Sequence, residues 1–190
     1  MHVKAEWTIP NVLTLLRLLA IPFLCRLIWL WPERRLTAFI LFLAIWFTDM
    51  LDGFIARRFN QTSEFGKLFD PLVDKLFQLA TAITMFMIGR IPLWVPVFML
   101  VREGLMILGS LFALKKLDKV VYSSLIGKLS TLLFVLAFGA LFWVPDEPRL
   151  IRDLLFVPPV LVSTLATIYY ACRNLVGSSH DDSDKNTDHA

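Results

Sequence analysis

Six apolar stretches, each close to 20 residues long, dominate this chain and limit what it can fold into. A helix of about 20 apolar residues spans the roughly 30 Å hydrocarbon core of a bilayer, and inside lipid it satisfies its own backbone hydrogen bonds. Hydrophobic residues make up 57% of the 190 residues and the mean hydropathy is +0.65, which argues against a soluble domain. The stretches are Val12–Trp31, Leu36–Arg57, Pro71–Ile88, Leu93–Leu114, Tyr122–Val144 and Leu150–Ala171. We expect an all-α polytopic membrane protein with six transmembrane helices, in one domain over residues 1–176.

Basic residues between the stretches indicate how the helices are oriented, because cytoplasmic loops carry an excess of lysine and arginine. The side that holds both chain ends has the larger set: Lys4, Arg57, Arg58, Lys67, Lys115, Lys116, Lys119 and Arg173. The opposite side has Arg34, Arg35, Arg90, Arg149 and Arg152. We therefore expect both termini in the cytoplasm. The net charge of +3 is then explained by basic loops that face an anionic membrane surface, so we expect no nucleic-acid partner.

The last residues, 177–190, are polar and acidic and lack apolar periodicity, so we expect a disordered tail. The two cysteines, Cys25 and Cys172, each lie within an apolar stretch, and no ligand-like spacing joins them. We expect two small buried hydrophobic residues rather than a disulfide.

Four aspartates interrupt the apolar pattern at the end of the second stretch and the start of the third. Asp49 and Asp52 are three residues apart and Asp70 and Asp74 are four apart, so each pair shares one helix face. If the two helices are antiparallel neighbours, all four carboxylates meet. Oxygen-only ligands suit Mg²⁺ or Mn²⁺, and two such ions about 4 Å apart clamp phosphoryl groups during displacement reactions. The pattern predicts a site with two divalent cations.

Two other interpretations of the aspartates stay open at this point. A cation-coupled transporter would use them as an ion path and would spread them across the membrane depth. In a purely structural interpretation they would pair with the basic residues nearby in a cytoplasmic loop, which are Arg57, Arg58, Lys67 and Lys75. Clustering beside Gly53, Ala56 and Arg57 favours an enzyme, because small residues let a ligand approach the backbone and an arginine fork suits phosphate.

Pro71 follows Asp70 directly and allows two helix boundaries. It could be the first residue of a helix that Asp70 caps, or it could lie inside a helix that begins earlier.

The spacing Asp49-x-x-Asp52-Gly53-x-x-Ala56-Arg57, eight residues, then Gly66-x-x-x-Asp70-x-x-x-Asp74 resembles the signature of the CDP-alcohol phosphotransferase (phosphatidyltransferase) family, with every position filled. The resemblance implies that an alcohol attacks the β-phosphate of a CDP-linked lipid and that CMP leaves. It also implies that Asp49, Asp52, Asp70 and Asp74 bind the metals, with Asp74 as general base. The CDP group would contact Asp52, Gly53, Ala56, Arg57, Gly66 and Asp70, and the protein would be a homodimer.

The flanking residues bear on the acceptor alcohol. The runs IPNVLTLLRLLAIP and ARRFNQTSEFGKLFDPLVDK resemble bacterial phosphatidylglycerophosphate synthases, which implies CDP-diacylglycerol and glycerol 3-phosphate as substrates at the cytoplasmic side of the bacterial membrane. Arg102 and Lys128, in blocks that also resemble this group, would bind the acceptor phosphate. Internal ion pairs are the alternative for both, and we take a pair between Arg102 and its neighbour Glu103 to be excluded by helix geometry.

A second acceptor stays open. The run GLMILGSLFALKKL after Glu103 lacks a further Arg-Glu pair and, with SSLIGKLST, resembles cardiolipin synthases, whose acceptor is phosphatidylglycerol.

Asn11, Thr14 and Arg17 share one face of the first stretch. They either reach the diphosphate or a lipid headgroup, or serve the fold through a cap at Asn11 and an ion pair at Arg17.

Overall fold

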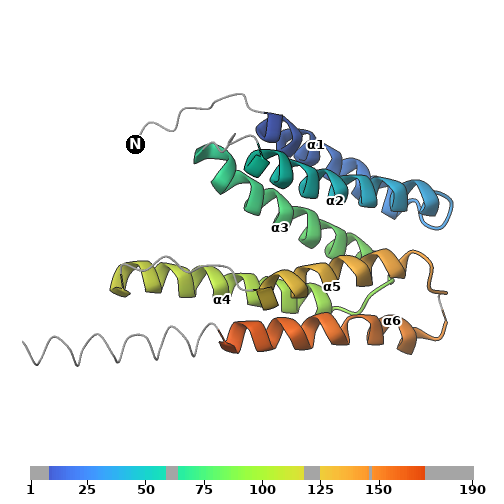
Figure 1. Cartoon of the computed structure of the whole chain (residues 1–190). Coiled ribbons are helices and arrows are strands. Elements are labelled where there is room, and N and C mark those ends of the chain that lie inside the picture. The colour runs from blue at the N-terminus through green and yellow to red at the C-terminus, as the bar shows by residue number, and fades with distance from the viewer. Residues whose placement is uncertain (1–8, 59–63, 118–124, 146, 170–190) are drawn as a thin grey trace, which may run out of the picture. The chain divides into compact units, whose positions relative to one another are not determined.

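The computed structural model describes residues 9–58, 64–117, 125–145 and 147–169, and these residues form helices joined by turns (Figure 1). The helices are α1 (Ile9–Trp29), α2 (Arg35–Arg58), α3 (Glu64–Met87), α4 (Trp94–Leu117), α5 (Leu125–Leu141) and α6 (Arg149–Leu155). After a turn at Phe156, residues 157–169 are again helical. No strand occurs in these ranges, so the predicted all-α class is confirmed.

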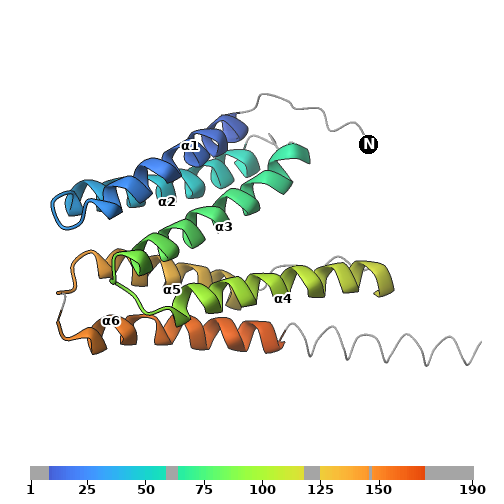
Figure 2. The ribbon, with the colours of Figure 1, turned by 180° about the vertical axis from the view of Figure 1, so that it is seen from behind.

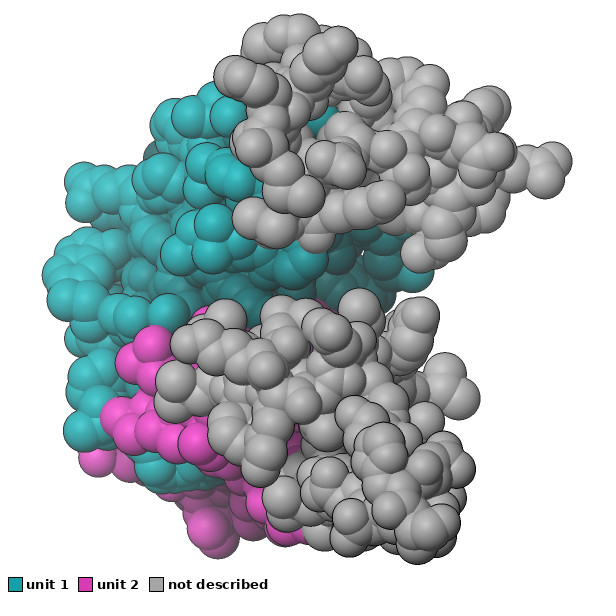
Figure 3. Space-filling model, turned by 90° about the vertical axis from the view of Figure 1, so that its left-hand side faces the viewer, with its two compact units in different colours: residues 1–96, 139–146 teal, residues 97–138, 147–190 magenta. Residues whose placement is uncertain are grey.

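The chain divides into two compact units, which Figure 3 colours teal and magenta. Unit 1 comprises residues 1–96 and 139–146, and therefore holds α1, α2 and α3. Unit 2 comprises residues 97–138 and 147–190, and therefore holds most of α4 and α5 together with α6. The prediction of one domain over residues 1–176 is not tested by this division.

In unit 1, α1 packs against both α2 and α3, and the three helices lie side by side when seen from the front and from behind (Figures 1 and 2). The buried positions of α1 recur every three or four residues, which is the spacing of one helix face: Thr14, Arg17, Ile21, Leu24 and Ile28. Two of the five are polar, and both lie in the half of α1 nearest its N-terminus. The apolar half forms the core, whereas the polar half lines the site described below.

Aromatic rings complete the core of unit 1. Phe42 of α2 contacts Phe77 of α3, with ring centroids 5.3 Å apart, and Phe142, with centroids 5.7 Å apart. All three side chains are at most 2% exposed. In unit 2 the equivalent contacts join Phe98 to Phe134 and Phe138 to Phe156.

The turn between α3 and α4 contains the sequence GRIP, residues 89–92, which separates the third and fourth apolar stretches. Gly89 has a φ of 73°, a left-handed conformation that a residue with a Cβ rarely adopts. Arg90 N–H donates to the Met85 carbonyl and Gly89 N–H to the Phe86 carbonyl, each at 2.8 Å, which is the hydrogen-bond pattern of a Schellman motif. The buried Arg90 guanidinium then donates to the carbonyls of Leu141 and Val144, each at 2.6 Å.

Two helical segments of the described chain are long and apolar enough to cross a membrane: Asn11–Trp29 with 19 residues and Arg149–Tyr169 with 21. Only 28% of each segment is buried within the protein, and many large apolar side chains of both segments are exposed. This surface is consistent with a membrane protein. Six transmembrane helices and their orientation stay a prediction.

Cys25 is a free, partly buried thiol, and Cys172 and the tail 177–190 lie outside the described residues.

Candidate active site

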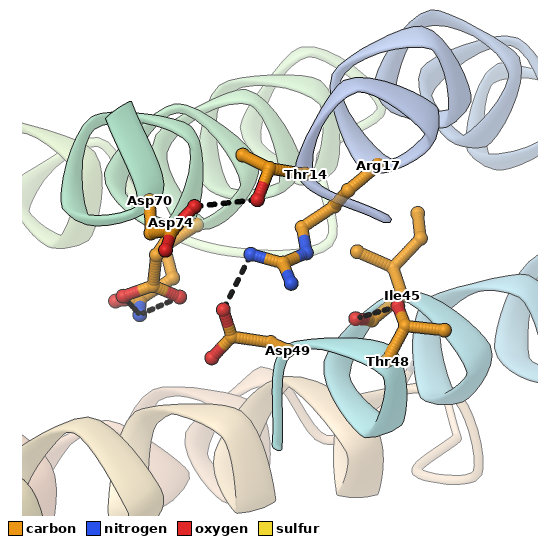
Figure 4. Close-up of polar contacts among 8 residues, drawn as sticks. Thr14, Arg17, Ile45, Thr48, Asp49, Asp70 and Asp74 are labelled. Carbon is orange, nitrogen blue, oxygen red and sulfur yellow. Dashed lines mark hydrogen bonds and ion pairs between the residues drawn. The ribbon is translucent and has the colours of Figure 1, made fainter. Parts of the chain in front are cut away.

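Three of the four predicted aspartates come together at one end of unit 1 (Figure 4). Asp49 lies in the second half of α2, and Asp70 and Asp74 lie in the first half of α3. The two helices run in opposite directions in Figure 1, so the second half of α2 and the first half of α3 lie at the same end of unit 1. Asp49 is close enough to the other two for their negative charges to act on it. The antiparallel arrangement inferred from sequence is therefore the one that the structure has.

The remaining signature residues lie on the same helices, but their side chains are outside the described part. Asp52, Gly53, Ala56 and Arg57 follow Asp49 in the last turns of α2, and Gly66 is in the first turn of α3. Helix periodicity places Asp52 one turn from Asp49.

Arg17 of α1 supplies the charge that faces Asp49. Its guanidinium forms an ion pair and hydrogen bond with Asp49 Oδ1. The Arg17 side chain is 1% exposed and that of Asp49 is 33% exposed. The sequence left two roles open for Arg17, which were contact with the diphosphate or a lipid headgroup and an ion pair that serves the fold. The contact with Asp49 is such an ion pair. A buried guanidinium needs such a partner because an uncompensated charge in a low-dielectric interior is costly.

Thr14 lies one turn before Arg17 and contacts the carboxylate of Asp70. Its hydroxyl donates to Asp70 Oδ1 at 2.5 Å. Two residues of the polar face predicted on α1, Thr14 and Arg17, therefore contact both helices that carry aspartates.

The position of Pro71 decides between the two helix boundaries considered for α3. The helix begins at Glu64, so Pro71 is inside it and Asp70 is not its cap. The helix continues past Pro71 with one backbone donor fewer.

Gln78 contacts Asp74, and the sequence analysis missed it. Its carboxamide Nε2 donates to both carboxylate oxygens of Asp74, at 3.3 and 3.2 Å. The signal was present, because residues four apart on a helix are neighbours. Gln78 follows Asp74 by four residues, so helix spacing alone places the two side chains next to each other.

The donor chemistry of the site fits a hard divalent cation. The contacts of Thr14 and Arg17 use Oδ1 of Asp70 and Oδ1 of Asp49, and the second oxygen of each carboxylate takes no part in these two contacts. Among the described side chains, no three or more acidic, histidine or cysteine residues lie close enough together to hold one ion. Asp52, the fourth predicted ligand, is outside that set. The facing negative charges are what a cation would neutralise.

The two acceptor candidates belong to unit 2. Arg102 lies in α4, and its guanidinium is 3.0 Å from the Glu103 carboxylate. Our exclusion of this pair is therefore wrong. Side chains at adjacent helix positions point about 100° apart, but both stems are long enough to bend together, and an arginine side chain only 9% exposed gains from a nearby anion. Lys128 lies in α5, with its side chain outside the described part.

Comparison with known proteins identifies the arrangement. The family model described as CDP-alcohol phosphatidyltransferase matches residues 7–171, which includes every signature residue. This chain belongs to the CDP-alcohol phosphatidyltransferase family. It is therefore a transferase of phospholipid biosynthesis, and the interpretation of the aspartates as a transporter's ion path is wrong. Members of the CDP-alcohol phosphatidyltransferase family generally use a divalent metal.

Individual relatives of this CDP-alcohol phosphatidyltransferase are bacterial. A probable phosphatidylglycerophosphate synthase of Mycobacterium tuberculosis is 33% identical over 172 residues, which cover 87% of this chain and 80% of the relative. A CDP-diacylglycerol–glycerol-3-phosphate 3-phosphatidyltransferase of Wigglesworthia glossinidia brevipalpis is 32% identical and covers 88% and 96%. A cardiolipin synthase (CMP-forming) of Streptomyces coelicolor is 33% identical, but over only 53% and 48%.

Proposed function

We propose that this protein transfers the phosphatidyl group of CDP-diacylglycerol to glycerol 3-phosphate and releases CMP. The observation that carries the proposal is the meeting of Asp49, Asp70 and Asp74 at one end of unit 1, on the two helices that hold the family signature. The acceptor is taken from the relatives aligned over most of their length, which are named for glycerol 3-phosphate or phosphatidylglycerophosphate.

In the proposed reaction the Asp74 carboxylate takes the proton of the acceptor hydroxyl. The acceptor oxygen then forms a bond to the β-phosphorus of CDP-diacylglycerol. The bond from that phosphorus to the bridging oxygen breaks, and its electron pair leaves with CMP. A carboxylate is a suitable base here because it needs to accept only one proton in the transition state.

Asp49, Asp52, Asp70 and Asp74 would hold two Mg²⁺ or Mn²⁺ ions, which neutralise charge on the diphosphate and the departing CMP. Asp52, Gly53, Ala56, Arg57, Gly66 and Asp70 would contact the CDP group. The small residues leave room for it beside the helix backbone, and Arg57 can bind phosphate oxygens with its fork.

Arg102 and Lys128 are the proposed partners of the acceptor phosphate. Arg102 is mostly buried and already neutralised by Glu103, so the acceptor phosphate would have to compete with that carboxylate. Replacing Arg102 should therefore raise the KM for glycerol 3-phosphate more than it lowers kcat.

We place the protein in the bacterial cytoplasmic membrane as a homodimer with six transmembrane helices, and with both termini and the active site on the cytoplasmic side. The support is the excess of basic residues on that side and the outward apolar surface of two helices. At 24 residues each, α2, α3 and α4 are about 36 Å long, which is sufficient to cross.

Transfer to phosphatidylglycerol is a second candidate, favoured by the partial alignment to the cardiolipin synthase. The deciding experiment incubates purified protein and CDP-diacylglycerol with either glycerol 3-phosphate or phosphatidylglycerol, and measures CMP. Release of CMP with glycerol 3-phosphate but not with phosphatidylglycerol supports the first acceptor. Release of CMP with phosphatidylglycerol but not with glycerol 3-phosphate would overturn it.

The catalytic part of the proposal has its own test. Asp74→Asn should reduce CMP release by about 100-fold or more while CDP-diacylglycerol still binds, because the amide cannot accept the proton. Wild-type turnover in this variant would remove Asp74 as the base.

A further inference from the structure

Gln78 is a buried amide directly beside the proposed base. Gln78 is 7% exposed, and it directly follows the core residue Phe77 on α3. Burial of an amide without a hydrogen bond destabilises the folded state, so the partner that Gln78 takes is significant. That partner is the Asp74 carboxylate, one helical turn earlier.

The other polar residues on this face of α3 make different contacts. The hydroxyl of Thr81 donates to the Phe77 carbonyl at 2.8 Å, and that of Thr84 to the Ala80 carbonyl at 2.7 Å. Both are satisfied by their own helix, as threonines in helices often are. Gln78 instead reaches a side chain of the site, although its own helix offers carbonyls at the same spacing.

The geometry of this contact restricts the carboxylate. Because Nε2 is almost equally distant from the two oxygens, it lies at the edge of the carboxylate between them. A metal ion bound by both oxygens would need the same edge. With Gln78 there, rotation of the carboxylate is restrained and the lone pairs directed away from Gln78 remain for other partners.

We propose that Gln78 is a positioning residue: its amide holds Asp74 by the edge between the two carboxylate oxygens, so that an outer lone pair is presented to the acceptor hydroxyl. This inference rests on the proposed function, in which Asp74 is the base. Proton transfer requires the carboxylate within hydrogen-bond reach of the hydroxyl, and misplacement of a reacting group by about 1 Å can cost on the order of 100-fold in rate.

The test replaces Gln78 by methionine, which has a similar length and shape but no N–H. CMP release is measured against CDP-diacylglycerol and glycerol 3-phosphate concentration, and Mn²⁺ binding to the substrate-free protein is followed by electron paramagnetic resonance. For Gln78→Met we expect kcat to fall about 10- to 100-fold. The KM for CDP-diacylglycerol and the dissociation constant for Mn²⁺ should stay within about twofold, because a positioning residue acts on the reacting geometry.

Thr81→Val is the matched control, since it removes a buried polar group from α3 that contacts no carboxylate. It should leave kcat unchanged. If Gln78→Met does not purify folded, Gln78→Asn makes the same prediction, because the amide is then one methylene too short to reach Asp74.

The outcomes separate the two proposals. Wild-type kcat in both Gln78 variants, with Asp74→Asn inactive, would overturn the role of Gln78 and leave the proposed function standing. Equal losses of kcat in the Gln78 variants and Thr81→Val, or a parallel loss of Mn²⁺ binding, would show a structural role only. Wild-type turnover in Asp74→Asn would remove the base and with it this inference.

Discussion

The ion pair between Arg17 and Asp49 allows a quantitative prediction. Arg17→Met keeps the length and apolar stem of the side chain but removes the charge and the donors. The substitution would leave the Asp49 carboxylate at a site where its main positive neighbour is gone and the charges of Asp70 and Asp74 remain. The folded state should therefore lose stability.

The magnitude follows from how deeply each partner is buried. Removing one partner of a fully buried pair costs about 3–5 kcal/mol. The side chain of Arg17 is 1% exposed but that of Asp49 is 33% exposed, so water screens part of the remaining charge. We expect a loss of about 2–3 kcal/mol in the free energy of unfolding. For a chain of this size that lowers the melting temperature by roughly 4–12 °C.

The assay is thermal unfolding of detergent-purified protein in excess chelator, followed by tryptophan fluorescence. Arg26→Met is the matched control, because it makes the same substitution on α1 at an exposed position. Its effect should be within about 0.5 kcal/mol. The double variant Arg17→Met/Asp49→Asn removes both charges, so its loss should be smaller than the sum of the single losses by at least about 1.5 kcal/mol.

Two results would refute this reasoning. One is that Arg17→Met and Arg26→Met melt at the same temperature. The other is that the losses of Arg17→Met and Asp49→Asn simply add, because then the two side chains do not stabilise each other in the folded protein.

Three further predictions concern the same unit. Removal of divalent metal by a chelator should abolish CMP release, and turnover that persists in chelator would contradict the need for metal. Mg²⁺ should raise the melting temperature of Arg17→Met more than that of the wild type, because a bound cation replaces the lost positive charge. Thr14→Val should destabilise by about 1 kcal/mol and weaken Mn²⁺ binding by loosening Asp70, whereas Thr48→Val, whose hydroxyl donates to a carbonyl of its own helix, should not affect Mn²⁺ binding. Arg90→Met should lower the free energy of unfolding by about 2–4 kcal/mol in a thermal melt, since it removes two charged hydrogen bonds and the contact with the Trp31 ring; a loss under about 0.5 kcal/mol would contradict this.

Local features of the fold were predictable from the sequence. The helices follow from the apolar stretches, and the break after α3 follows from Gly89, whose φ of 73° suits glycine. The shared face of Asp70 and Asp74 follows from a spacing of four. These features depend on a few consecutive residues, and so the chain alone carries the information.

Features that depend on competition between partners were harder to predict. Helix geometry does not favour a contact between Arg102 and Glu103, yet burial makes that pair form. Pro71 was compatible with two boundaries, because a proline removes one hydrogen bond without ending a helix that its neighbours stabilise. In both cases the surrounding structure outweighs a local preference.

The sequence by itself determined that this chain is helical and that it belongs to the CDP-alcohol phosphatidyltransferase family, and it predicts which aspartates carry the chemistry. Only the tertiary structure decided which residues of α1 support them. Arg17 is 32 residues from Asp49, and Thr14 is 56 residues from Asp70. These contacts require a particular rotation of α1 against α2 and α3. That rotation is set by the packing of the buried apolar face of α1, which no local pattern specifies.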